Sequence, residues 1–259
     1  MSNPFYAPGE QRAEKVQALF ATIATRYDFI NDVQSLGLHR RWKRRLVALA
    51  NPKADTLALD VCCGTGDLAL ALAAQGAQVT GLDFSEAMLA VAEARRQKSE
   101  VGGLKSDAGP NLTSGLQPLT SVRFLHGDAM KLPFADETFD LVTVGYGLRN
   151  LARWEAGLTE MARVARPGGR LLVLDFGKPD HALWRTIYFG YLRLIVPVFG
   201  LLFAGRPDAY AYILESLKHY PAQRGVEAKM RDLGLINVRV INFLGGAMSI
   251  NVGERAGQS

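Results

Sequence analysis

The sequence predicts an α/β protein with a mostly parallel sheet of seven strands, helices on both faces and an antiparallel hairpin at its carboxyl end. Short apolar runs alternate with helical stretches from residue 56 onward, which is typical of successive βαβ units. A glycine-containing bend directly follows the first apolar run, and Gly245-Gly246 separates the last two.

The composition is that of a globular protein with a buried core. Of the 259 residues, 48% are hydrophobic and 21% are charged, which excludes disorder as the main state. The formal net charge of +5 suits an anionic surface but is small for a nucleic-acid specialist. Cys62 and Cys63 are the only cysteines; being adjacent, they cannot link distant parts of the chain, which indicates a reducing compartment. The start lacks a basic segment followed by an apolar run, so we expect no secretory signal and a cytoplasmic location.

The amino-terminal segment, residues 1–50, is expected to form a helical lid. Apolar residues recur at three- and four-residue spacing from Val16 to Ile23. A second helix follows Leu36 and carries the basic run His39–Arg45, whose apolar neighbours share one side.

The strands and helices of the sheet follow in order. The predicted strands are Leu57–Val61, Gln78–Leu82, Val122–His126, Leu141–Val144, Arg170–Phe176, Ile236–Phe243 and Met248–Val252. The predicted helices among them are Leu68–Gln75, Glu86–Arg96, Trp154–Val164 and Arg224–Leu233.

Two segments depart from this alternation. Residues 99–121 are rich in Gly, Ser, Pro and Thr, and we interpret them as a disordered surface insertion rather than a functional lid. Residues 183–204 are apolar and long enough to cross a bilayer, but they contain two arginines and Pro197. Because buried arginines are costly in lipid and proline removes a helix hydrogen bond, we favour a kinked helix within a substrate-side insertion, residues 183–222.

The bend after the first strand has the chemistry of a nucleotide-like cofactor site. Gly64 and Gly66 lack the Cβ that would keep a ligand from the backbone. Their spacing also satisfies a dinucleotide fingerprint, with Asp83 at the end of the second strand to bind a ribose hydroxyl. Asp67 disfavours a dinucleotide, because a carboxylate at the helix start repels a pyrophosphate. S-adenosylmethionine, with an ammonium that Asp60 could attract, fits better; the alternative that Asp67 only caps the helix stays open.

Asp128 and Ala129 come directly after the third strand. This places them at the sheet edge where open α/β folds bind ligands. The Asp128 carboxylate could accept a hydrogen bond from an adenine amino group. Alternatively, it only closes an Asx turn.

With these motifs the chain resembles the class I S-adenosylmethionine-dependent methyltransferases, which have a Rossmann-like fold. More narrowly, it is similar to the family that methylates a ring carbon in menaquinone and ubiquinone biosynthesis. The resemblance covers nearly the whole chain as a single domain, residues 1–259. It rests on YDFIND at 27–32, LHRRWK at 38–43, CGTGD at 63–67, GLRN at 147–150, RPGGR at 166–170, LDFGKP at 174–179, and on Tyr212, Glu215-Ser216 and Tyr220-Pro221.

The resemblance implies roles for two sets of residues. Those expected at the cofactor are Thr65, Asp83, Asp128 and Ala129, beside the bend of Gly64 and Gly66; those expected at the substrate ring are Tyr27, Arg149 and Asn150. Two departures put single hydrogen bonds in doubt: Cys62 stands where the family often has Gly or Ala, and Gly145 where a small hydroxyl residue is common. The segment 99–121 is also longer than is usual in the family.

The implied chemistry is methyl transfer to a carbon made nucleophilic by loss of a neighbouring hydroxyl proton. Arg149 would supply a fixed charge for the phenolate, while Tyr27 and Asn150 orient the hydroxyl or a water that takes its proton. Alternatively, Arg149 ties its loop to a carboxylate and Tyr27 is a half-buried aromatic. The four histidines show no metal-ligand spacing, so we expect no metal.

The implied substrate is a polyprenylated quinol, with demethylmenaquinol preferred. The methoxy-polyprenyl-benzoquinol of ubiquinone biosynthesis and demethylphylloquinol stay open, and an RNA methyltransferase, an NAD-linked oxidoreductase and a non-catalytic scaffold are remote alternatives. We expect no nucleic-acid partner and leave a homodimer open. The run His39–Arg45 could meet anionic lipid and residues 183–204 the isoprenoid tail, so we expect peripheral docking at the inner membrane surface; otherwise the basic run is a solvated helix face.

Overall fold

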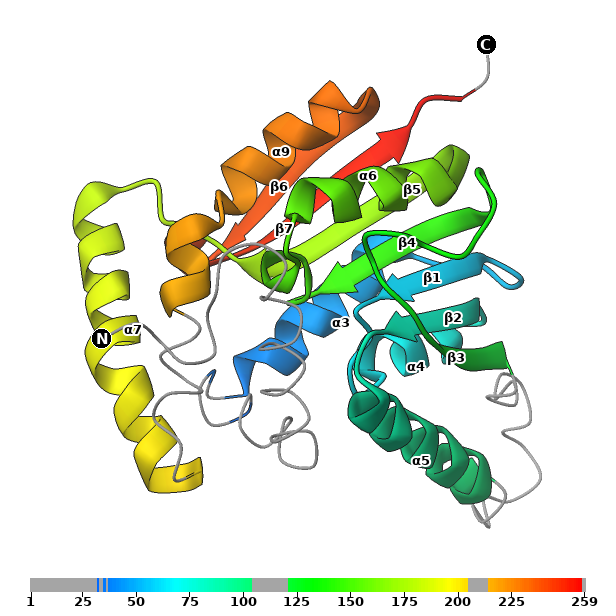
Figure 1. Cartoon of the computed structure of the whole chain (residues 1–259), viewed down its shortest axis with the longest axis horizontal. Helices are drawn as coiled ribbons and strands as arrows, with labels where there is room; N and C mark the ends of the chain where they lie inside the picture. Colours follow the sequence, from blue (N-terminus) through cyan, green and yellow to red (C-terminus); the bar gives the residue numbers. More distant parts are fainter. Residues whose placement is uncertain (1–31, 33–34, 36, 104–120, 205–213, 258–259) are drawn as a thin grey trace.

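A computed structural model gives the structure of most of the chain. It describes residues 32, 35, 37–103, 121–204 and 214–257 (Figure 1). Tyr27 lies outside the described residues, as does most of the expected lid, residues 1–50.

Seven strands form one sheet in the order β3-β2-β1-β4-β5-β7-β6 (Figure 1). Their bounds are β1 Leu57–Val61, β2 Gln78–Asp83, β3 Val122–His126, β4 Phe139–Gly145, β5 Ala165–Phe176, β6 Leu235–Phe243 and β7 Met248–Arg255. Neighbours among β1 to β5 pair in parallel, whereas β7 runs antiparallel to both β5 and β6. The predicted mostly parallel sheet with a carboxyl-terminal antiparallel hairpin is therefore confirmed.

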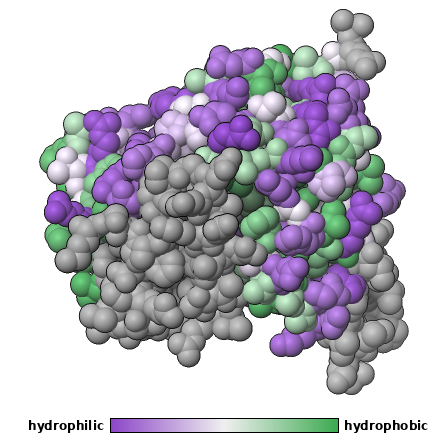
Figure 2. Space-filling view, viewed as in Figure 1, coloured by the Kyte–Doolittle hydropathy of each residue, from purple (hydrophilic) through white to green (hydrophobic). Residues whose placement is uncertain are grey.

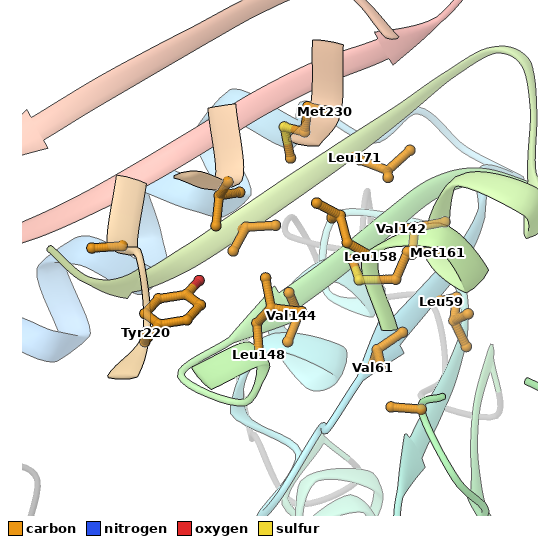
Figure 3. Close-up of a cluster of buried hydrophobic side chains, with 14 of the residues drawn as sticks. Leu59, Val61, Val142, Val144, Leu148, Leu158, Met161, Leu171, Tyr220 and Met230 are labelled. Carbon is orange, nitrogen blue, oxygen red and sulfur yellow. The ribbon is translucent and has the colours of Figure 1, made fainter. Parts of the chain in front are cut away.

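Helices cover both faces of this sheet. The described helices are α3 Leu38–Ala50, α4 Asp67–Ala73, α5 Glu86–Gly103, α6 Trp154–Val164, α7 Ala182–Ala204 and α9 Ala222–Asp232, with the 3-10 turns η3 Leu148–Asn150 and η4 Leu244–Gly246. On one face, Leu158 and Met161 of α6 pack against Leu59 and Val142, as Figure 3 shows. Side chains of α3 and α4 belong to a second buried cluster that includes the alternate strand residue Ala58.

The helix α3 packs against the sheet. Trp42 and Leu46 are buried in the second cluster, and the Trp42 ring centroid lies 6.4 Å from that of Phe243 on β6. The Arg170 guanidinium on β5 donates to the carbonyl oxygens of Leu49 and Ala50 at the end of the helix. Lys43, on the same helix, is thereby held at a constant position relative to the sheet.

One expectation from the sequence needs correction. The predicted insertion begins later than residue 99, because α5 continues to Gly103; each added helical residue gains one backbone hydrogen bond. Residues 104–120 lie outside the described part.

The helix predicted around Pro197 is present as α7, which is continuous from Ala182 to Ala204. The carbonyl that proline leaves without its helix partner belongs to Arg193, an exposed residue where water can satisfy it.

The helix α7 has two different faces. Tyr188, Leu192 and Val196 are buried in the first cluster, whereas Leu183 and Leu194 are 65% and 66% exposed. Within the described ranges, no helix is both long enough and apolar enough to span a bilayer.

We expect Leu158→Ala to lower the free energy of unfolding by about 2–5 kcal/mol, because Leu158 is fully buried and its loss leaves a cavity. Urea denaturation followed by circular dichroism measures this change. As a control, Leu194→Ala at an exposed site should change stability by less than about 0.5 kcal/mol. Equal losses in the two variants would contradict the packing described here.

Candidate active site

A large cavity opens where β1, β2 and β4 end. Its empty space is about 960 Å³, with the open solvent at its mouth included. Five of the predicted site residues line it: Gly64, Asp83, Asp128, Ala129 and Asn150. A smaller cavity of about 320 Å³ shares four lining residues with it and is bordered by Lys43, Asp60, Thr65 and Asp67.

The two glycines of the bend serve different purposes. Both have positive φ, 54° at Gly64 and 81° at Gly66, which favours glycine. A Cβ on Gly64 would meet no atom within 4 Å, so its backbone faces open space suited to a ligand. A Cβ on Gly66 would lie only 2.9 Å from the Phe124 ring. Gly66 is therefore explained by its positive φ and by its packing against Phe124.

Asp83 joins the loops that follow β1 and β2. Its Oδ2 accepts a hydrogen bond from the Gly64 amide and its Oδ1 one from the Ser85 amide, each at 2.8 Å. Burial raises the pKa of this carboxyl. Each oxygen has a further lone pair, so Asp83 can still accept bonds from a ligand hydroxyl in the cavity it lines.

Asp60 is a buried acid at the small cavity. The Thr143 hydroxyl donates to its Oδ1 at 2.8 Å, while its Oδ2 has no hydrogen-bond partner among the described residues. Burial raises the pKa of Asp60 to about 7. A cationic group placed in the small cavity would favour the ionised carboxylate.

Asp67 forms ion pairs and does not act as the helix cap. The N-cap of α4 is Gly66, and Asp67 binds Lys43 through Oδ2 and Arg95 through Oδ1, each at 2.6 Å. Burial acts to raise the pKa of Asp67, but the two cations hold it below its ordinary value. Because these cations balance the charge of Asp67, this carboxylate repels an anionic ligand less than an unpaired one would. The preference for a cationic cofactor rests better on Asp60.

Asp128 closes a turn and also lines the large cavity. Its Oδ1 accepts a hydrogen bond from the Met130 amide at 2.8 Å, which closes an Asx turn. Its Oδ2 makes no hydrogen bond to the described residues, and both Asp128 and Ala129 line the large cavity. The turn thus orients a carboxylate that can still accept from a ligand.

Arg149 lies behind the cavity wall. It is buried, its Nε is 3.2 Å from Asp175 Oδ1, and its guanidinium donates to Ser216 Oγ at 2.7 Å. The same guanidinium nitrogen donates to Asn150 Oδ1 at 3.0 Å, and Asn150 lines the cavity whereas Arg149 does not. The ion pair with Asp175 supports the alternative that Arg149 ties its loop to a carboxylate.

Three contributors to the site were not singled out as such from the sequence. Lys43 borders the small cavity, and Asp175 and Ser216 hold Arg149. All three lie inside motifs that carried the family resemblance, but their partners are 24 or more positions away or come from other elements. Pairing between such residues is set by packing, so spacing alone offered no signal.

Comparison with known proteins places the chain in a family. Residues 9–255 match a family model described as the ubiE/COQ5 methyltransferase family. A demethylmenaquinone methyltransferase of Bacillus licheniformis is 37% identical over 247 residues, which cover 94% of this chain and 98% of that protein. One from Staphylococcus aureus strain JH9 is 36% identical over 252 residues, 96% of each chain.

Solved structures show the same fold. A putative S-adenosyl-L-methionine-dependent methyltransferase of Methanococcus maripaludis superposes with a TM-score of 0.59 at 17% identity, over 91% of this chain and 93% of that one. The fold, the cavity at the strand ends and the family model agree with the prediction made from the sequence. The chain belongs to the ubiE/COQ5 methyltransferase family and is an S-adenosylmethionine-dependent methyltransferase.

Proposed function

We propose that this enzyme methylates a ring carbon of a polyprenylated quinol and converts demethylmenaquinol to menaquinol. The observation that carries the proposal is the similarity, over 94% and 96% of this chain, to two proteins named demethylmenaquinone methyltransferase. The benzoquinol of ubiquinone biosynthesis and demethylphylloquinol offer the same ring chemistry and are tested beside it.

The residues at the strand ends suit the cofactor. Asp83 would accept from a ribose hydroxyl and Asp128 from the adenine amino group. Asp60 Oδ2, which has no hydrogen-bond partner among the described residues, would attract the ammonium. Gly64 leaves open space for the part of the cofactor between its ribose and its ammonium. Thr65 borders the small cavity at the far end of that space. Bound S-adenosylmethionine supplies a methyl group on a sulfonium, whose positive charge disappears on transfer.

On the substrate side, we assign the contact with the quinol to Asn150. It lines the large cavity, donates its Nδ2 to the Tyr146 carbonyl at 3.1 Å and accepts from Arg149. Since Asp175 balances the charge of Arg149, we assign Arg149 the positioning of Asn150 rather than direct stabilisation of a phenolate. Tyr27 keeps its proposed role beside the ring.

The exposed face of α7 is suited to a lipid surface, where the substrate tail resides. It carries Leu183, Ile187, Leu194, Ile195 and Val198, all exposed. These positions share one side of the helix, and hydrophobic residues show at the molecular edge where α7 runs (Figure 2). The exposed Arg185 and Arg193 could meet anionic headgroups, as in helices that lie in the membrane interface. We propose peripheral docking through this face.

A direct assay tests the function. The purified protein is incubated with S-adenosylmethionine and reduced demethylmenaquinone, and mass spectrometry should detect a product heavier by one methylene group. The demethylated benzoquinol and demethylphylloquinol are supplied in parallel reactions. If product forms only with the benzoquinol or only with demethylphylloquinol, that quinol is the substrate. If none of the three quinols gives product, quinol methylation is refuted.

We expect Asp83→Ala to weaken binding of S-adenosylhomocysteine by about 10-fold or more, because a charged acceptor of the ribose is lost. Isothermal titration calorimetry measures the affinity. Asp55→Ala, at an exposed acid distant from the cavity lining, serves as the control and should bind as the unsubstituted protein does. Unchanged affinity of Asp83→Ala would remove Asp83 from the cofactor site.

Two variants at Arg149 separate positioning from simple charge. Arg149→Lys keeps the positive charge but cannot reproduce the geometry that reaches Asn150, Asp175 and Ser216 together. We expect both Arg149→Lys and Arg149→Met to lower kcat by about 10-fold or more, with S-adenosylhomocysteine affinity within about twofold. If Arg149→Lys retains most of the activity while Arg149→Met does not, charge is the decisive property and positioning is wrong.

Docking is tested by co-sedimentation with liposomes containing phosphatidylglycerol. The double variant Ile187→Gln, Leu194→Gln should lose most of its liposome-bound fraction, because the apolar area available for insertion falls. Ile236→Gln, at an exposed apolar residue of β6, is the matched control. Its liposome-bound fraction should equal that of the unsubstituted protein. Equal retention of all three proteins would show that α7 is not the docking face.

A further inference from the structure

The small cavity beside the glycine bend has an unusual charge arrangement. Lys43 and Arg95 both bind the carboxylate of Asp67, each at 2.6 Å. Lys43 is the more enclosed of the two, with its side chain 12% exposed, and it lines the cavity, whereas Arg95 does not.

The Lys43 ammonium has donors to spare. Its Nζ makes one hydrogen bond with the described residues, to Asp67 Oδ2 at 2.6 Å, and lies 5.8 Å from the Tyr146 ring centroid. An ammonium carries three N–H donors, so two are left for a ligand. Asp60 borders the same cavity and lacks a hydrogen-bond donor, because its buried Oδ2 has no partner in the described part of the chain.

The cavity lies where the amino-acid end of the cofactor would extend. The large cavity, with Asp83 and Asp128, suits the nucleoside, and the two cavities share Cys62, Gly64, Gly145 and Tyr146. Because the two cavities adjoin at the bend, a nucleoside bound in the large one can extend its substituent into the small one. That substituent ends in one ammonium and one carboxylate.

Building on the proposed cofactor geometry, we infer that Lys43 binds the carboxylate of S-adenosylmethionine while Asp60 faces its ammonium. The small cavity then recognises a zwitterion with one fixed charge of each sign. Lys43 is a specificity-determining residue, because it favours the complete cofactor over nucleosides that lack the carboxylate. It reaches the cavity from α3, a helix outside the glycine bend.

A purely structural role for Lys43 makes a different prediction. If Lys43 only anchors α3 to α4 through Asp67, its loss would affect every nucleoside ligand alike. Arg95 contacts the same carboxylate at the same distance of 2.6 Å, so Arg95→Met is a matched control for loss of an Asp67 partner. Arg95 also donates to the carbonyl and hydroxyl oxygens of Thr65, but unlike Lys43 it does not border the cavity itself.

The test uses two ligands that differ only in the carboxylate, S-adenosylhomocysteine and its decarboxylated analogue, each titrated by calorimetry. The unsubstituted protein should bind the complete ligand about 10- to 100-fold more tightly than the analogue. In Lys43→Met this preference should fall to within about twofold, while Arg95→Met should retain it. Thermal unfolding of each variant checks that it is folded.

Other outcomes overturn the inference. Lys43→Met that weakens both ligands equally assigns Lys43 a structural role. Equal affinity of the unsubstituted protein for the two ligands refutes carboxylate recognition. Because this measurement needs no variant, it still decides the question if the Lys43→Met protein does not fold. Failure of the unsubstituted protein to bind either ligand refutes the cofactor geometry itself and is thereby distinguishable.

Discussion

The Asp83 carboxylate holds the cofactor end of the sheet together. It accepts one amide from the loop after β1 and one from the loop after β2, so the two loops keep a constant distance. The loop after β1 can approach because Gly64 and Gly66 take positive φ values that other residues rarely adopt. Next to them, Cys62 also has a positive φ, of 54°, and a Cβ on Gly147 would collide with its side chain. Strain and close approach thus gather at the cavity, as they often do at functional sites.

Charge at this edge is distributed in a way that suits a cationic, zwitterionic ligand. Burial leaves Asp60 with a pKa of about 7 and an oxygen without a partner in the described structure, so a nearby ammonium would stabilise its ionised form. Asp67 is instead neutralised by Lys43 and Arg95. Asp60, on β1, borders the same small cavity and makes no ion pair with the described residues.

Two elements outside the cofactor bend divide the remaining tasks. The turn η3 presents Asn150 to the cavity and keeps Arg149 behind it, held by Asp175 and Ser216. Burying a charged guanidinium is tolerable because the Asp175 carboxylate balances its charge and the Ser216 hydroxyl accepts a hydrogen bond from it. The helix α7 buries one face against the first core cluster and leaves an apolar face exposed. An enzyme whose substrate has a polar ring and a long apolar tail would use both kinds of surface.

The positions of the strands, of the bend and of the acid at the end of β2 could be predicted from the sequence, because periodicity, glycine spacing and the residue after a strand are local properties. The cavity was also predictable, since parallel strands end at one edge. The contacts of Lys43 with Asp67 and of Arg149 with Asp175 became visible only in the folded chain. The same holds for the packing of Gly66 against the Phe124 ring. Those contacts depend on how helices and loops pack across the sheet, and no spacing along the chain specifies the distance between residues that packing brings together.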